Sequence, residues 1–95
     1  MVKLCVDIYW VTIGGENPAE FIARYANRIP YYHFKDGAPG SFTELGRGTV
    51  DLAAAAQAAL ATHPAWIVCE QDRTDKSPVA SVAESREYLR RKLGL

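Results

Sequence analysis

Three short apolar segments recur about thirty residues apart in this chain, and each is followed by a segment with helical character. The apolar segments span residues 2–9, 29–34 and 65–69 and are rich in β-branched and aromatic residues, which favour strands. Because strands that alternate with helices at this interval are joined by right-handed crossovers, the pattern predicts a parallel sheet. We therefore expect an α/β fold of three consecutive βα units, forming a single domain over residues 1–95.

The helical segments are predicted near residues 18–27, 51–62 and 79–93. Asn17-Pro18 is typical of a helix N-cap followed by proline at the first helical position. Residues 35–49 contain several glycines and show no clear periodicity, so we expect a long loop of the functional or mobile kind. Within it, Gly46-Arg47-Gly48 indicates a turn that needs a positive φ angle.

Composition excludes several classes of function. Lys and Arg together number 11, as do Asp and Glu, so the net charge is zero and argues against nucleic-acid or anionic-membrane binding through bulk charge. No apolar run approaches the roughly 20 residues of a membrane span, and an early acid interrupts any signal-peptide core. Two cysteines without metal-ligand spacing favour a reducing compartment, so we expect a cytoplasmic protein.

A potential metal ligand or acid/base group stands at the end of each predicted strand. These residues are Asp7, His33 and Glu70. In parallel α/β folds the functional groups gather at the carboxyl ends of the strands, so the three side chains are expected at equivalent places. Two carboxylates and an imidazole suit Mn²⁺, Mg²⁺, Co²⁺ or Zn²⁺. The alternative is structural, with the acids capping helices and the histidine hydrogen-bonded locally.

Four short segments, in order, carry a resemblance to a known family. They are Asp7-Ile8-Tyr9-Trp10 with Gly14-Gly15 and Pro18, then His33-Phe34-Lys35-Asp36-Gly37, then Leu45-Gly46-Arg47-Gly48-Thr49-Val50-Asp51, and finally Val68-Cys69-Glu70-Gln71-Asp72. On these segments the chain resembles the C-terminal part of the sugar phosphate isomerase/epimerase family, which has the xylose-isomerase-like TIM barrel. The resemblance extends over essentially the whole chain.

The resemblance implies a divalent metal bound by four side chains at the mouth of the barrel. Asp7, His33 and Glu70 match three of those positions, on the sixth, seventh and eighth strands. The fourth ligand is a glutamate from an earlier strand that this chain does not contain. In the epimerase branch that glutamate and the one at Glu70 exchange a proton next to a carbonyl, so half of the acid/base pair is present. Trp10 stands where such enzymes often have a histidine, which implies an apolar wall and leaves the sugar unidentified.

Three further residues are candidates for substrate binding. Lys35 and Asp36 belong to the matched motif, where they would contact substrate oxygens or orient the metal ligands. The alternative for this pair is an ordinary surface ion pair. Arg47 could meet an anionic group of a sugar phosphate, or simply belong to its turn.

Three strands cannot close into a barrel, which takes eight strands. The sheet would expose two edges and one apolar face, so we expect a homo-oligomer. Trp66 and the two cysteines, Cys5 and Cys69, lie in predicted strands and are expected to be buried.

Three functional hypotheses follow. The first is that the chain is the C-terminal portion of a metal-dependent isomerase or epimerase acting on a small sugar or sugar phosphate. In that case the chain would be inactive by itself if the reaction requires the missing glutamate. The second is a non-catalytic barrel fragment that serves as an assembly module. The third is a relative of the endonuclease-type metal-dependent hydrolases, whose sites need more histidines than this chain places at its strand ends.

Overall fold

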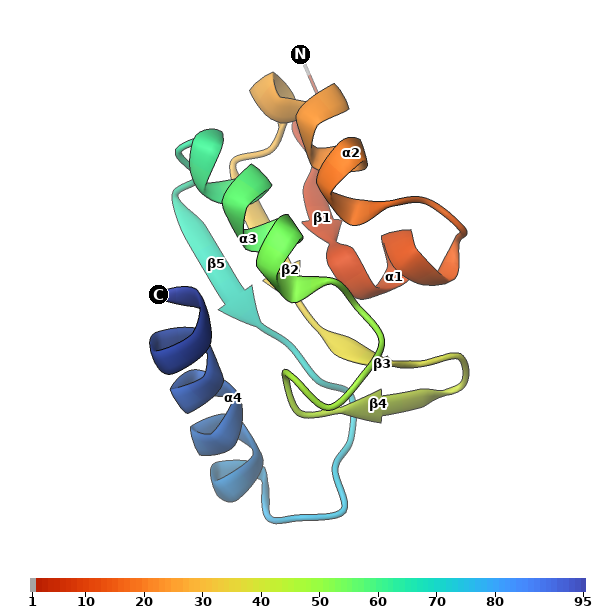
Figure 1. Cartoon of the computed structure of the whole chain (residues 1–95), viewed down its shortest axis with the longest axis vertical. Helices are drawn as coiled ribbons and strands as arrows, with labels where there is room; N and C mark the ends of the chain where they lie inside the picture. Colours follow the sequence, from red (N-terminus) through yellow and green to blue (C-terminus); the bar gives the residue numbers. More distant parts are fainter. Residues whose placement is uncertain (1) are drawn as a thin grey trace.

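In the computed structural model, which describes residues 2–95, three parallel strands form the central sheet (Figure 1). They are β1 (Cys5–Asp7), β2 (Tyr31–Phe34) and β5 (Trp66–Cys69), and they lie in the order β1-β2-β5. The strands of successive βα units are thus neighbours in space, as in a barrel wall. The predicted α/β class with a parallel sheet is confirmed.

Each crossover helix begins at a side-chain cap that the sequence supplies. The carboxamide of Asn17 accepts a hydrogen bond from the backbone N–H of Glu20, and Asp51 accepts one from Ala54 in the same way. The hydroxyl of Ser77 caps the last helix. The helices are α1 (Ile8–Ile13), α2 (Pro18–Arg24), the 3₁₀ turn η1 (Ala26–Arg28), α3 (Leu52–Ala61) and α4 (Pro78–Leu93).

The core lies between one face of the sheet and helices α2 and α3, which lie in front of the sheet in Figure 1. Tyr32 and Phe34 point from β2 into this core and are fully buried. Alanines on α3 let the helix approach the sheet closely, and Ile22 of α2 fills the space beside them. The α4 helix packs against α3 and β5. We call the face of the sheet that packs against α2 and α3 the covered face.

The first strand is shorter than predicted. The prediction extended it over residues 2–9, but the chain leaves the extended conformation after Asp7 and enters α1. The carboxylate of Asp7 causes this change of direction, because its Oδ1 atom accepts hydrogen bonds from the backbone N–H groups of Tyr9 at 3.0 Å and Trp10 at 3.1 Å. Asp7 therefore caps α1 and also stands at the carboxyl end of β1.

Residues 35–49, predicted to lack regular structure, contain a β-hairpin. Its strands are β3 (Asp36–Ala38) and β4 (Ser41–Thr43), which pair antiparallel around a turn where Gly40 has a φ of +77°. The hydroxyl of Tyr9 donates to the carbonyl of Ala38 at 2.8 Å and so fastens the hairpin to α1. The hairpin lies beyond the carboxyl ends of the parallel strands (Figure 1).

The other face of the sheet has no helix over it, and we call it the open face. Side chains alternate along each strand, so Cys5, Tyr31, Trp66 and Val68 point away from α2 and α3. Trp66 is 69% exposed and Cys5 is also exposed, so their predicted burial is wrong; Cys69, on the covered face, is half-buried. Among residues 2–95, none of the helices has the length and apolar character needed to cross a membrane.

Candidate functional site

The side chains of Asp7 and His33 meet at the carboxyl end of the open face. The two residues are paired across β1 and β2, and Nδ1 of His33 lies 3.9 Å from Oδ2 of Asp7. Because Oδ1 of Asp7 is engaged by the start of α1, it is Oδ2 that faces the imidazole. Strand pairing therefore places a carboxylate oxygen and an imidazole nitrogen side by side without help from a loop.

Burial raises the pKa of Asp7 above its ordinary value. The hydrogen bonds from Trp10 and Tyr9 and the positive charge of Lys35 act in the opposite direction. The nearby carboxylate of Glu70 adds to the increase in pKa. The Asp7 carboxylate thus lies within electrostatic reach of both Lys35 and Glu70.

Glu70 follows β5 directly, and its backbone N–H donates to the carbonyl of Phe34 at 3.0 Å. Its carboxylate turns toward Lys35, whose Nζ lies 3.2 Å from Oε2 of Glu70. The same ammonium forms a short hydrogen bond with the carboxylate of Asp72. Burial alone would lower the pKa of Lys35, but these two carboxylates outweigh burial and raise the pKa.

Three aromatic rings surround the ammonium of Lys35. Its Nζ lies 4.2 Å from the ring centre of Phe42, 5.0 Å from that of Trp10 and 5.5 Å from that of Tyr9. These distances fall within the range of cation–π attraction. Trp10 is 51% exposed, so one side of this aromatic group forms an apolar wall open to solvent.

The three predicted metal ligands lie at the same end of three adjacent strands but do not form a closed ligand group. Within residues 2–95, no three His, Cys, Asp or Glu side chains are gathered closely enough to hold a metal ion. The donor chemistry of Asp7, His33 and Glu70 suits a divalent ion. Asp7 and His33 already approach each other, whereas the carboxylate of Glu70 is engaged by Lys35.

Asp36, predicted to contact substrate or orient ligands, is buried and holds a loop together. Its Oδ1 accepts from the backbone N–H groups of Gly37 and Val50, and its Oδ2 accepts from those of Gly46 and Gly48, all at 2.8–3.1 Å. Four donors saturate a carboxylate. The structure therefore shows Asp36 fixing the backbone that follows β4 and leaves it no acceptor for a substrate hydroxyl.

Gly46 and Gly48 of this loop are glycine for different physical reasons. Gly46 has a φ of +94°, which confirms the predicted positive-φ turn. Gly48 has an ordinary φ angle, but a Cβ atom there would lie 2.3 Å from Oδ1 of Asp36. Because the backbone approaches the Asp36 carboxylate closely, even a methyl group at this position would force its neighbours to shift.

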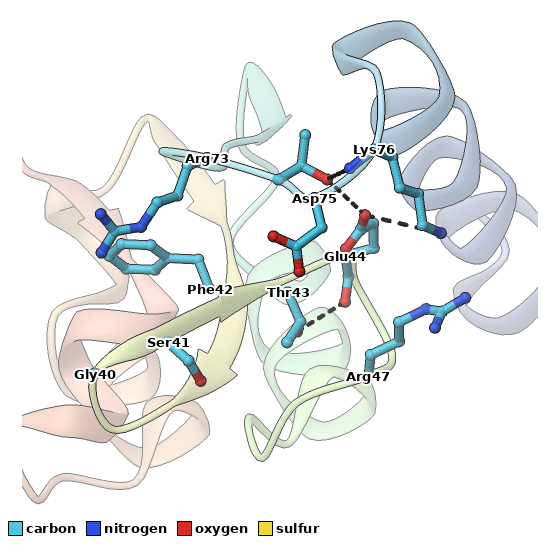
Figure 2. Close-up of a pocket in the computed structure, with 10 residues that line it drawn as sticks. Gly40, Ser41, Phe42, Thr43, Glu44, Arg47, Arg73, Asp75 and Lys76 are labelled. Carbon is cyan, nitrogen blue, oxygen red and sulfur yellow. Dashed lines mark hydrogen bonds and ion pairs between the residues drawn. The ribbon is translucent and has the colours of Figure 1, made fainter.

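Arg47, the candidate for an anionic substrate group, pairs with Glu84 of α4. Its side chain lines a pocket of about 410 Å³ between β4 and the loop after β5, together with Arg73 and Lys76 (Figure 2). Lys76 also contacts Glu84. Both cations hold the pKa of Glu84 below its usual range. The structure thus gives Arg47 a carboxylate partner within the chain.

Glu44 joins the two loops that border this pocket. Its Oε1 accepts a hydrogen bond from the hydroxyl of Thr74 at 3.0 Å and lies 3.8 Å from Nζ of Lys76 (Figure 2). Burial alone would raise the pKa of Glu44, but the Thr74 hydrogen bond and the Lys76 charge leave the pKa lowered. This contact ties the loop that carries Glu70 and Asp72 to the end of β4.

Three residues of the site were missed by sequence reasoning. Asp72 lies in the matched segment 68–72, so its acidic side chain two residues after Glu70 was an available signal. Phe42 carried no such signal, because it lies in a segment without periodicity. The guanidinium of Arg73 lies 5.3 Å from the Phe42 ring centre. Nothing in the sequence around Arg73 predicted this contact.

The fold is an α/β arrangement of three consecutive βα units with a parallel sheet, which is consistent with part of a barrel, and polar side chains stand at the carboxyl ends of the strands. Comparison with protein-family models and with curated protein sequences gives no match. The solved structures that are similar to this chain include two sugar phosphate isomerase/epimerase proteins from Parabacteroides distasonis ATCC 8503. One has a TM-score of 0.80 and 22% identity over 95% of this chain. The other has a TM-score of 0.81 and 23% identity over 96%.

The predicted resemblance is therefore confirmed at the level of the fold. The alignments cover 31% of each of the two neighbouring chains, so this chain spans about a third of their length. In this chain Asp7 ends β1, His33 is the last residue but one of β2, and Glu70 directly follows β5.

Proposed function

We propose that these three βα units form part of a divalent-metal-dependent isomerase or epimerase site for a sugar or sugar phosphate. The observation that carries the proposal is the pairing of Asp7 and His33 across adjacent strands, 3.9 Å apart, in a fold similar to sugar phosphate isomerase/epimerase proteins. A carboxylate and an imidazole on one open sheet end are the donors that a borderline divalent ion prefers.

In this proposal Asp7, His33 and Glu70 would hold a divalent ion, and the ion would polarise the oxygens of a bound sugar. The carboxylate of Glu70 would remove the proton from the carbon next to the sugar carbonyl, or return one to it, and the second acid/base group would perform the opposite transfer. Trp10 and Phe42 provide an apolar wall that keeps water from the reacting carbon. The second acid/base group belongs to a part of the barrel outside these three units, so we expect this chain alone to bind metal and not to epimerise sugars.

Mn²⁺ binding to the purified chain, followed by electron paramagnetic resonance, tests the proposal. Asp7→Asn, His33→Ala and Glu70→Gln should each weaken Mn²⁺ binding by at least about tenfold, since loss of a supporting partner alone costs that much. Asp51→Asn and His63→Ala are matched controls, because both side chains are exposed and lie outside the site. Unchanged binding in all three site variants would overturn the assignment.

The open face supports a second candidate function, that of an assembly module. Tyr31, Trp66 and Val68 form an exposed apolar surface, and β1 and β5 have no further neighbouring strand within residues 2–95. An uncovered face of this kind with two strand edges favours association. We propose that copies of the chain associate through this face.

Native mass spectrometry and sedimentation velocity test this association. Trp66→Lys places a charge in the open face and should shift the protein to monomer. Val79→Lys is the control, because Val79 is at least as exposed as Trp66 but belongs to α4 and not to a strand of the sheet. A wild-type chain that is monomeric at micromolar concentration, with slow hydrogen exchange in β1 and β5, would contradict this second candidate.

A further inference from the structure

Lys35 is the only basic side chain among the buried residues of 2–95, with 2% of its side chain exposed. Alternation along β2 places it on the same side as His33, one step beyond the end of the strand. Its ammonium contacts Glu70 and Asp72. Its positive charge also acts to lower the pKa of Asp7. A cation belonging to the protein therefore contacts Glu70, one of the carboxylates that the proposed metal site would use.

The surroundings of this ammonium hold it in place from two directions. Phe42, Trp10 and Tyr9 present their rings to it on one side. The two carboxylates lie within hydrogen-bonding distance and supply more negative charge than one ammonium neutralises. The arrangement favours a cation, and Lys35 supplies it from within the chain.

We propose that Lys35 is an internal cation that holds Glu70 until a divalent ion displaces it, so that Lys35 and the ion compete for this carboxylate. The inference rests on the proposed metal site. An ion bound at Glu70 would lie close to the buried ammonium of Lys35, and two cations at short range repel each other. The oxygen that contacts Lys35 is also withdrawn from metal coordination while that contact lasts.

Asp72 has a distinct place in this competition. It is the second carboxylate on the same ammonium, on a half-exposed side chain two residues beyond Glu70. When Glu70 turns to a divalent ion, Lys35 keeps Asp72 as its partner and is not left buried without a counterion. Asp72 thus lowers the cost of releasing Glu70.

The test compares Mn²⁺ affinity of the wild-type chain with two variants that should act in opposite directions. Lys35→Met removes the competing charge and should tighten Mn²⁺ binding by at least about tenfold. Asp72→Asn leaves Lys35 more dependent on Glu70 and should weaken binding by about threefold to tenfold. Lys3→Met and Asp75→Asn remove the same charges from exposed positions and should change the affinity by less than about twofold, because solvent screens them.

Equal or weaker Mn²⁺ binding by a folded Lys35→Met variant would overturn the proposal. If that variant fails to fold by circular dichroism, Asp72→Asn decides, and unchanged or tighter binding there overturns it. Wild-type binding that depends on His33, with no gain in Lys35→Met, would remove this inference and leave the metal site intact. Absence of Mn²⁺ binding in both the wild-type chain and Lys35→Met would remove the proposed metal site as well.

Discussion

The covered face and the open face of the central sheet draw on the same three strands but are stabilised by different interactions. On the covered face, Tyr32 and Phe34 are fully buried against α2 and α3. On the open face, their neighbours Tyr31 and His33 stay partly exposed and are followed by charged groups at the strand ends. The covered face is held by apolar packing, and the carboxyl end of the open face by hydrogen bonds and ion pairs.

This difference shows how one short sheet can separate folding from chemistry. Apolar burial is non-directional and supplies most of the stability of a small domain. Hydrogen bonds and ion pairs contribute less net stability but fix particular atoms in place. Substitutions in the two regions should therefore differ both in size and in what they change.

The largest loss of stability is expected at the centre of the covered face. Phe34→Ala removes a fully buried ring and should lower the free energy of unfolding by about 3–5 kcal/mol. Trp66→Ala, on the open face, should change it by less than about 0.5 kcal/mol. Urea unfolding at low protein concentration measures both. Equal losses would show that the open face is as tightly packed as the covered one.

The next largest effect is expected at Asp36. Asp36→Asn replaces an oxygen that accepts two backbone hydrogen bonds with an NH₂ group that cannot accept them, and the cost should be about 2–4 kcal/mol. Asp51→Asn is the matched control, since asparagine is an equally good N-cap for α3. Amide hydrogen exchange at Gly46, Gly48 and Val50 should accelerate in Asp36→Asn. Unchanged exchange there would contradict the role assigned to this carboxylate.

A smaller effect is expected at Gly48, where space is the constraint. Gly48→Ala inserts a methyl group against Asp36 and the backbone of Gly37 and should cost about 1–3 kcal/mol. Gly40→Ala has open space around the new methyl group and meets only the penalty of a positive φ angle, about 1 kcal/mol. Thermal unfolding of the two variants separates crowding from backbone strain. A larger loss at Gly40 would reverse the interpretation.

The smallest effect is expected at Glu44 and depends on pH. A carboxyl whose pKa is lowered on folding contributes stability above its unfolded-state pKa, ordinarily 4.5, and loses it as the pH falls through the lowered value. Glu44→Gln should therefore cost less than about 1 kcal/mol near pH 7, and this difference should vanish well below pH 4.5. Urea unfolding of both proteins across this range measures it. A difference that persists at low pH would show that the Glu44 charge is not its cause.

The sequence was informative where local patterns decide the structure. The cap at Asn17 was readable from its residue type, and α2, α3 and α4 lie close to their predicted positions. The end of β1 was misjudged, because Ile8 and Tyr9 are as compatible with a strand as with a helix. Trp66 was misjudged because a strand residue is buried only if something covers its face.

The candidate site was predictable in part for the same reason. Residues that end adjacent parallel strands must gather at one edge, so the nearness of Asp7 and His33 follows from the fold class. The environment of Lys35 does not follow from it. Phe42 reaches Lys35 from strand β4 of the hairpin and Asp72 from the loop after β5, and the contact between Glu44 and Thr74 ties these two segments together.

By itself the sequence determined the order of the three parallel strands and of α2, α3 and α4, the cap at Asn17, and the end of the sheet at which polar groups collect. These properties depend on residue types and spacing within a dozen neighbours, which act before the chain is folded. Only the tertiary structure decided that Asp36 is saturated by four backbone donors and that Glu70 is held by Lys35. Such partners lie in different loops, and which atoms meet is settled only when the packed helices and strands fix the loop ends in space.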